Sequence, residues 1–141
     1  MKILLPVDGS PFTQHMLAYV AAHCDVWAAA QPTYTVLHVV PAVPPRAAAM
    51  LDPAVLHDYY EEETDKVFHP VRRFFEQHPL AVTFVHRVGH AAQEIARCAQ
   101  EGPFDLLIMG SHGHGALGNW VMGSVATQVM ARCTTPVLLV R

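Results

Sequence analysis

Five glycines and two serines gather in one stretch of the sequence, from Gly110 to Ser124. The apolar run Phe104–Met109 before this stretch is typical of a buried strand, and Val125–Arg132 after it has the pattern of a helix. Glycine allows positive φ angles and close approach of another molecule, while a helix start offers unpaired N–H groups and a positive dipole end. A glycine-rich turn between a strand and a helix therefore predicts an anion-binding site, most often for phosphate.

Two common phosphate-binding templates do not account for this stretch. A Walker A loop needs a Gly-Lys-Ser/Thr ending, but there is no Lys or Arg from Gly110 to Ala131. The spacing of Gly113, Gly115 and Gly118 matches the dinucleotide fingerprint, yet the residues about 20 positions later are apolar and include no Asp or Glu. We interpret that match as chance.

A third pattern covers more of the chain. Two residues separate Gly110 from Gly113, nine separate Gly113 from Gly123, and Ser124 follows directly. This spacing resembles the G-x2-G-x9-G-(S/T) nucleotide-binding signature of the universal stress protein family. The resemblance extends to the opening strand and acidic turn, the second strand and the last strand of that family, at Lys2–Ser10, Val36–Val39 and Cys133–Arg141. It therefore covers essentially the whole chain.

The elements that must position the glycine-rich stretch alternate regularly. We expect strands at Lys2–Val7, Thr33–Val40, Leu80–Val88, Phe104–Met109 and Thr135–Val140. We expect helices from Phe12 to between Ala28 and Gln31, from the N-cap Asp52 toward His78 with a kink or break at Pro70, at Ala91–Gln100, and at Asn119–Arg132; the proline-rich segment Pro41–Met50 should be a loop. Such alternation predicts an α/β fold, a parallel sheet with helices on both faces. The resemblance implies an open five-stranded sheet in the order 3-2-1-4-5, a Rossmann-like fold of the adenine nucleotide alpha hydrolase-like type.

Composition limits the class of protein. With 141 residues, 52% hydrophobic and 15% charged, the chain should bury a full core and form a single domain, residues 1–141. A net charge of -3 with scattered basic residues argues against a nucleic-acid partner. No apolar run approaches the roughly 18 residues of a membrane span, and no signal peptide is recognisable. We expect a cytoplasmic protein with no membrane partner, whose three cysteines are reduced.

In open parallel sheets, ligands bind beyond the carboxyl ends of the strands. The resemblance implies that this chain binds ATP or AMP there, with phosphates on backbone amides of the glycine-rich loop and on the Ser124 hydroxyl. It implies ribose hydroxyls on the Asp8 carboxylate and an adenine edge near Val39. The alternative for Asp8 is that its side chain bonds its own turn or caps the first helix. The implied site is Pro6, Val7, Asp8, Val39, Met109, Gly110, Ser111, His112, Gly113, Gly123, Ser124 and Val125.

Histidines stand at informative places. Many members of the family carry Lys or Arg just after the second glycine, where this chain has His114. Phosphate charge must then be met by amides, by a distant Arg, or by protonated His112 and His114, whose reference pKa of about 6.5 would make affinity rise as pH falls. Two imidazoles do not complete a tetrahedral metal site, so we expect no metal held by the protein, and Mg²⁺ or Mn²⁺ to arrive with the phosphates. His38, in a buried strand, should be packed and hydrogen-bonded rather than a ligand.

The sequence favours a nucleotide-binding regulatory module over an efficient catalyst, because it has no Ser-His-Asp order, no His-Glu-x-x-His and no cation in the phosphate loop. The resemblance implies that this module acts in a stress response. Two alternatives stay open: slow ATP hydrolysis or self-phosphorylation at Ser111 or Ser124, and a dimeric interaction protein that needs no nucleotide. The apolar strand Val137–Val140 would expose an unpaired sheet edge. Antiparallel pairing with a second copy would cover it, which resembles the usual dimer of the family.

Overall fold

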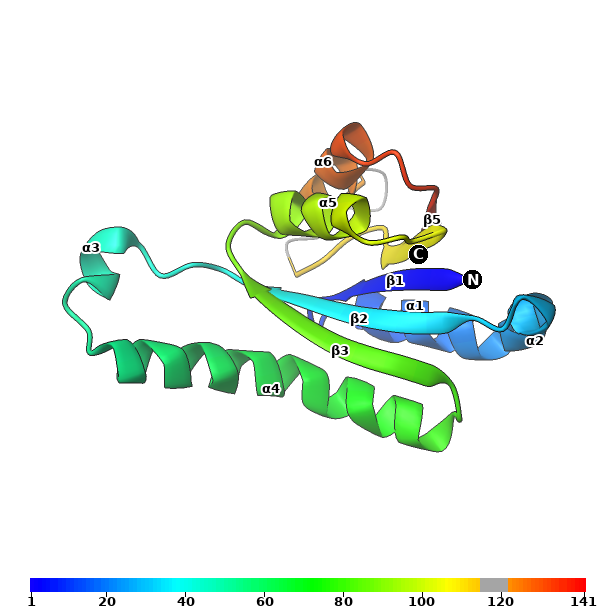
Figure 1. The fold of residues 1–141 in the computed structure, drawn as a ribbon, viewed down its shortest axis with the longest axis horizontal. Helices are drawn as coiled ribbons and strands as arrows, with labels where there is room; N and C mark the ends of the chain where they lie inside the picture. Colours follow the sequence, from blue (N-terminus) through cyan, green and yellow to red (C-terminus); the bar gives the residue numbers. More distant parts are fainter. Residues whose placement is uncertain (115–121) are drawn as a thin grey trace.

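Five parallel strands form an open sheet in the order β3-β2-β1-β4-β5 in the computed structural model, which describes residues 1–114 and 122–141 (Figure 1). The strands are β1 (Lys2–Val7), β2 (Thr33–Val40), β3 (Ala81–Val88), β4 (Leu106–Gly110) and β5 (Val137–Val140). The predicted α/β class and the strand order implied by the family resemblance are both confirmed. The starts of β3, β4 and β5 lie one or two residues later than predicted, at the fraying ends of apolar runs.

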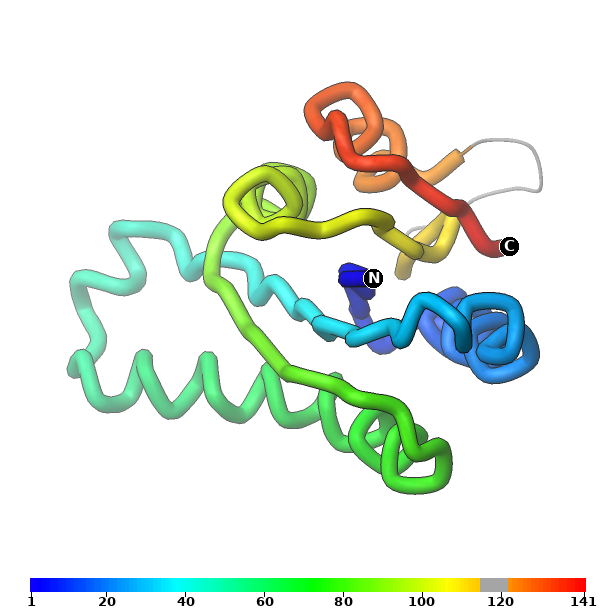
Figure 2. The backbone as a smooth tube through the Cα atoms, turned by 45° about the vertical axis from the view of Figure 1, so that its right-hand side comes forward, coloured from blue at the N-terminus to red at the C-terminus, as the bar shows by residue number. Residues whose placement is uncertain are grey.

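Helices cover both faces of the sheet (Figures 1 and 2). On one face lie α1 (Pro11–Ala22) and α4 (Pro53–Gln77); on the other lie α5 (Ala91–Glu101) and α6 (Ser124–Arg132). The strand sequences explain this arrangement, because alternate residues enter opposite cores. Ile3 and Leu5 belong to the core under α1 and α4, whereas Leu4 belongs to the core under α5 and α6. β1 therefore reads as a continuous apolar run, as a strand covered on both faces should.

The first helix is shorter than predicted. Helical residues do continue to Ala30, but in three segments, α1, α2 (Cys24–Trp27) and the 3-10 turn η1 (Ala28–Ala30). The break falls at His23, whose φ of -120° and ψ of 13° leave the helical region. Its backbone N–H and its ring Nδ1 both donate to the Tyr19 carbonyl, at 3.1 and 2.8 Å. A side chain that caps the carbonyl end in this way ends the α-helix before its apolar pattern does.

Two predictions about prolines are wrong. The segment Pro41–Met50 contains a short helix, α3 (Pro45–Ala48), because a proline is tolerated at the first helical position, where its missing N–H would have had no partner. Pro70 does not interrupt α4, which runs without a break from Pro53 to Gln77 behind its N-cap Asp52. Asp52 Oδ1 accepts the Ala54 N–H at 2.8 Å, as the predicted cap should.

The predicted start of the last helix at Asn119 is also wrong where it can be compared. Residues 119–121 lie outside the described residues, but Met122 and Gly123 are not helical, and α6 begins at Ser124 with Gly123 as its N-cap. Gly123 N–H donates to the Ser111 carbonyl at 2.8 Å, a bond to the loop after β4. That hydrogen bond sets where α6 begins, and the apolar periodicity of the sequence carries no information about it.

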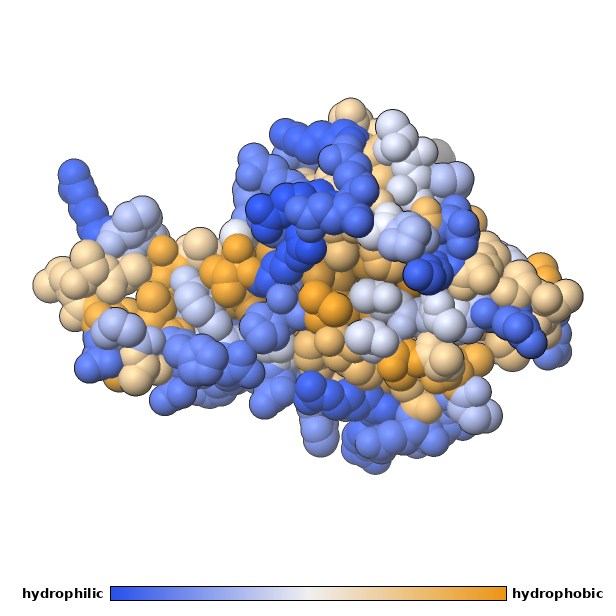
Figure 3. Space-filling model, in the orientation of Figure 1, coloured by the Kyte–Doolittle hydropathy of each residue, from blue (hydrophilic) through white to orange (hydrophobic). Residues whose placement is uncertain are grey.

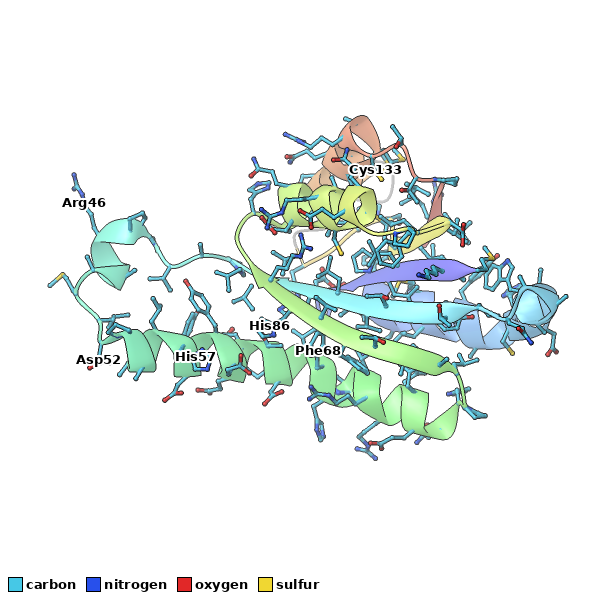
Figure 4. The ribbon with its side chains drawn as sticks, viewed as in Figure 1. Arg46, Asp52, His57, Phe68, His86 and Cys133 are labelled. Carbon is cyan, nitrogen blue, oxygen red and sulfur yellow. The ribbon has the colours of Figure 1, made fainter. Side chains whose placement is uncertain are left out.

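The amino-terminal part of α4 extends beyond the sheet together with α3 (Figures 1 and 2). We refer to residues 45–60 as the arm. Apolar side chains are visible on the arm in Figure 3, where Met50, Val55 and Tyr59 are 87%, 54% and 43% exposed. Farther along the same helix, Phe68 points toward the sheet and is 2% exposed (Figure 4). One continuous helix thus has a carboxyl-terminal half packed on the sheet and an amino-terminal end that projects away from it.

Within residues 1–114 and 122–141, no helix combines the length and the apolar character that crossing a lipid bilayer requires.

Candidate functional site

A cavity of about 970 Å³ lies at the carboxyl ends of β1, β2 and β4. Side chains of α4 bound it on one face of the sheet, and α5 and the start of α6 bound it on the other. This is the position where open parallel sheets bind ligands. All the predicted site residues line the cavity except Ser111, which is 4% exposed and lies outside its lining. The structure therefore brings together the turn after β1, the end of β2 and the loop after β4.

Asp8 is held by its own turn through one carboxylate oxygen. Asp8 Oδ1 accepts the Ser10 N–H and the Thr13 hydroxyl, each at 2.9 Å, and the Asp8 N–H donates to Thr13 Oγ1 at 3.1 Å. Gly9 completes the turn with a φ of +76°, an angle that side chains disfavour. The alternative predicted for Asp8, a bond within its own turn, is thus present. It uses Oδ1 and leaves Oδ2 directed toward Gly113 across the cavity mouth.

The signature glycines allow segments of the chain itself to approach closely. A Cβ at Gly113 would lie 2.6 Å from Asp8 Oδ2, and a Cβ at Gly110 would lie 2.7 Å from Phe12 Cβ. A Cβ at Gly123 would meet the His112 backbone at 3.0 Å. Among the described glycines, positive φ angles occur only at Gly9 and Gly89, so positive φ is not the reason for these three. At each of the three positions, a side chain would push apart the two segments of chain that meet there.

The start of α6 faces the cavity. Ser124, Val125 and Ala126 line it, and α6 has no side-chain cap at Gly123. The first N–H groups of a helix have no partner within the helix, and they carry the positive end of its dipole. Thr127 is the first residue whose N–H returns to the helix, to the Gly123 carbonyl at 3.0 Å. This end of the cavity is therefore suited to an anion.

The predicted histidines lie beside the glycines. His114 Nε2 donates to the Asp8 carbonyl at 2.5 Å and so links the loop after β4 to the turn after β1. His112 Nδ1 is 3.0 Å from the Ser111 hydroxyl, and its ring lies 5.1 Å from the ring of Phe12. Within residues 1–114 and 122–141, no three His, Cys, Asp or Glu side chains converge as a metal site would require.

The sequence profile of the Universal stress protein family matches residues 1–141. The chain belongs to the universal stress protein family. Universal stress protein MJ0531 of Methanocaldococcus jannaschii is 26% identical over 140 residues, 99% of this chain and 81% of that protein. Universal stress protein Slr1230 of Synechocystis is 43% identical over 54 residues, 38% of this chain but only 19% of that longer protein.

Solved structures show the same fold. The chain superposes on MJ0577, also from M. jannaschii, with a TM-score of 0.82 and 27% identity, over 99% of this chain and 94% of that one. An Archaeoglobus fulgidus universal stress protein in complex with dAMP gives 0.69 at 16% identity, over 100% and 98% of the two chains. An Arabidopsis thaliana family member with AMP bound gives 0.68 at 12% identity, over 99% and 90%.

A cation outside the glycine signature lines the wall of the cavity that α4 forms. Lys66 of α4 lines the cavity and binds Glu63 Oε1 at 2.7 Å and Glu62 Oε1 at 3.3 Å. Hydrogen bonds to Glu63 and then Glu62 raise the pKa of Lys66, so it stays charged at neutral pH. The sequence did not indicate Lys66, because its i,i+3 and i,i+4 spacing to two glutamates is typical of an ordinary exposed helix face.

The end of β2 supplies main-chain groups, as the family resemblance implies for Val39. β2 continues for two residues beyond its last pairing with β1, which joins His38 to Val7. The Val40 carbonyl accepts the Gly89 N–H at 2.9 Å on the β3 side. Successive strand residues direct their backbone groups to alternate sides, so the Val39 carbonyl points to the side where β1 has ended. Val39, Val40 and Pro41 all line the cavity.

His38 is packed and hydrogen-bonded, as predicted from its buried strand. It is 7% exposed, and its Nδ1 lies 2.8 Å from the Val7 carbonyl. Its ring meets Phe68 of α4 edge-on at 6.2 Å. Burial lowers the pKa of His38, which keeps the ring neutral at neutral pH. His38 also lines the cavity, which the sequence did not indicate.

Proposed function

We propose that this universal stress protein binds an adenine nucleotide, ATP or AMP, in the cavity and acts as a stress-response regulatory module formed by one domain, residues 1–141. One observation carries the proposal: the start of α6, Gly113 and Asp8 line one cavity, and Asp8 Oδ2 is directed toward Gly113. An anion-binding end and a carboxylate are the complement of a phosphorylated ribose. The cavity volume of about 970 Å³ also lies within the range of about 300 to 1,000 Å³ common for small-molecule sites.

Each part of the nucleotide has a proposed partner. The N–H groups at the start of α6 and the Ser124 hydroxyl hold the phosphates, and Asp8 Oδ2 accepts from a ribose hydroxyl. The base lies near Val39 and Pro41. Pro6, Val7, Met109 and Gly110 shape the floor where β1 and β4 end. Mg²⁺ or Mn²⁺, when present, is held by the phosphates. The AMP and dAMP bound by two relatives of the same fold support the choice of an adenine nucleotide.

Titration calorimetry of ATP, AMP and GTP tests the proposal. Gly113→Val should abolish adenine-nucleotide binding in a folded protein, because its side chain would displace Asp8. Ala47→Val also introduces a valine, but in the arm and away from the sheet, and should bind as the wild type does. Absence of binding by the wild type would reject nucleotide binding and favour the nucleotide-independent interaction protein. Retention of label from γ-labelled ATP, lost in Ser124→Ala, would instead indicate slow self-phosphorylation at the cavity.

We propose that the protein is a cytoplasmic homodimer through β5. Among the described strands, β5 pairs with β4 alone, and Val137, Leu138 and Leu139 are only half-buried. An apolar open edge of this kind is covered in stable proteins, and antiparallel pairing with a second copy would cover it around a two-fold axis. Light scattering at micromolar concentration should give twice the chain mass of 15.5 kDa. A monomer would contradict the dimer without affecting nucleotide binding.

A further inference from the structure

We propose that His38 accepts a hydrogen bond from the bound nucleotide through its Nε2 atom and thereby selects a ligand with a donor at that point. This inference rests on the proposed adenine-nucleotide function and adds a specificity residue outside the glycine signature. The donor is either the exocyclic amino group of the base or a ribose hydroxyl, since both present N–H or O–H groups.

The hydrogen bond of His38 to β1 sets its tautomer. The Val7 carbonyl can only accept, so the proton of the neutral ring must lie on Nδ1, 2.8 Å away. The other nitrogen, Nε2, then carries a lone pair and can only accept. β1 and β2 pair directly at Val7 and His38, which holds the ring orientation.

Nε2 is the ring nitrogen of His38 that the contact with Val7 does not use. In the part of the chain that the structure describes, the buried side-chain polar atoms without a partner are Ser10 Oγ, Tyr34 OH and Arg87 Nη1. His38 Nε2 is not among them, and the Val7 contact uses Nδ1. His38 is 7% exposed and lines the cavity, and from this we infer that Nε2 is the ring atom that meets the cavity. A ligand there would meet a fixed acceptor.

The titratable groups around His38 come from three elements. Asp8 lies on the turn after β1, Glu63 and Lys66 lie on α4, and His86 lies on β3 beside His38. His86 is directed to α4, where its Nε2 lies 3.4 Å from Glu61 Oε1 (Figure 4). Burial outweighs the nearby carboxylates and lowers the pKa of His38. The acceptor therefore stays available at neutral pH and is lost when acid protonates Nε2.

The chemistry of the ligand explains why a second acceptor is useful. A ribose and an adenine amino group together present more donors than Asp8 can serve, since Asp8 Oδ1 already accepts two hydrogen bonds in its own turn. Only Oδ2 remains for a ligand. A neutral acceptor on the neighbouring strand adds one hydrogen bond without adding a second negative charge close to the phosphates.

Two substitutions separate the acceptor from the packing. His38→Asn can keep a donor to the Val7 carbonyl but has no acceptor at the position of Nε2. His38→Gln can place an amide oxygen near that position. We expect His38→Asn to weaken ATP binding about fivefold to tenfold, the value of one neutral hydrogen bond, and His38→Gln to stay within about twofold of the wild type.

Three ATP analogues identify the donor by calorimetry: purine riboside triphosphate, which lacks the amino group, 2′-deoxy-ATP and 3′-deoxy-ATP. The analogue that lacks the donor should lose affinity in the wild type and lose nothing further in His38→Asn. A loss at the purine analogue assigns the amino group, and a loss at a deoxy analogue assigns that hydroxyl. Equal binding of ATP by folded His38→Asn and wild type, or independent losses for all three analogues, would overturn the inference.

The pH dependence of nucleotide affinity provides a second test, which does not depend on the folding of His38→Asn. Wild-type affinity should fall, relative to His38→Gln, as pH drops through the lowered pKa of His38. Parallel profiles for the two proteins would overturn the inference. If binding is lost in Gly113→Val yet unchanged in His38→Asn, the proposed function stands and only the role of His38 fails. If the wild type binds no adenine nucleotide, both fail.

Discussion

The polar groups at the two ends of the sheet differ in whether they are hydrogen-bonded within the protein. At the amino ends of the strands, Asp105 Oδ2 accepts the Lys2 N–H at 2.7 Å, and the rings of His23 and His78 each donate to a carbonyl four residues earlier at 2.8 Å. The Tyr34 hydroxyl is the exception there, buried with no partner among the described residues. At the carboxyl ends, Asp8 Oδ2 is directed toward Gly113, and His38 and the start of α6 line the cavity.

This difference distinguishes a structural end from a binding end. Loops at both ends contain carboxylates and histidines, so residue types alone do not tell them apart. What separates them is whether the hydrogen-bonding capacity is used within the protein or left available beside a cavity. Substitutions at the amino end should therefore change stability alone, and substitutions at the carboxyl end should change ligand binding more than stability.

The largest effect is expected from Phe75→Ala at the amino end. Phe75 is 6% exposed and packs against Tyr34 and Phe84, with ring centroids 6.2 and 6.1 Å away. Deleting its ring should lower the unfolding free energy by about 3 to 5 kcal/mol, the range for Phe-to-Ala cavities. Urea unfolding measures the loss. Nucleotide affinity of the folded variant, measured by calorimetry, should be unchanged; a large drop would contradict the separation of the two ends.

Asp8→Ala should have the next largest effect, at the carboxyl end. Removing the proposed ribose acceptor should weaken ATP binding roughly 10- to 100-fold, the value of a hydrogen bond to a charged group. Asp105→Ala is the matched control, because Asp105 also accepts a backbone N–H in a loop, but at the amino end. It should lower the melting temperature and leave affinity unchanged. Similar ATP affinities for the two variants would contradict the distinction between a structural end and a binding end.

Stability at low pH should reveal the neutral state of His38. Burial lowers the pKa of His38 in the folded protein, whereas the unfolded chain keeps a value of about 6.5. Below that pH the unfolded state binds the extra proton, so the unfolding free energy should fall toward the lowered pKa and then level off. The slope is at most about 1.4 kcal/mol per pH unit. Urea unfolding should show a shallower slope for His38→Asn; identical slopes would assign the effect to other histidines.

The smallest effects are expected at the two histidine caps. His23 and His78 each cap a helix and stack on the aromatic ring of Tyr19 or Phe74, with centroids 4.1 and 4.3 Å apart. Replacing either by Ala should cost about 1 kcal/mol, the value of one hydrogen bond. Thermal unfolding measures the loss, and ATP affinity should not change. A histidine cap whose removal altered ATP binding would show that the two ends are coupled.

Much of the fold could be predicted from local patterns. Apolar runs and their spacing located all five strands, because a strand buried on both faces must be apolar throughout. The order of the strands came from the resemblance, since the chain pattern does not state which strands pair. The break at His23 and the start of α6 at Ser124 depend on particular hydrogen bonds, to Tyr19 and Ser111, that periodicity cannot encode.

The candidate site was predictable where a loop follows a strand. The residues after β1 and β4 are adjacent in sequence to the strand ends, so their meeting follows from the topology. Thr13 and Lys66 were missed because they reach the cavity from helices, and the sequence does not tell which helical turn lies at the mouth. For His38, the apolar run of its strand predicted burial correctly but could not show that the ring lines the cavity.

The contact between Gly113 and Asp8 has a consequence for how these positions vary among relatives. The space beside Gly113 is filled by the Asp8 carboxylate, so a side chain at position 113 requires a shorter or displaced residue at position 8. Conversely, a longer acid at position 8 has no room unless the loop after β4 moves. Two positions far apart in the chain therefore share one volume. In an alignment of the family, positions 8 and 113 should therefore covary.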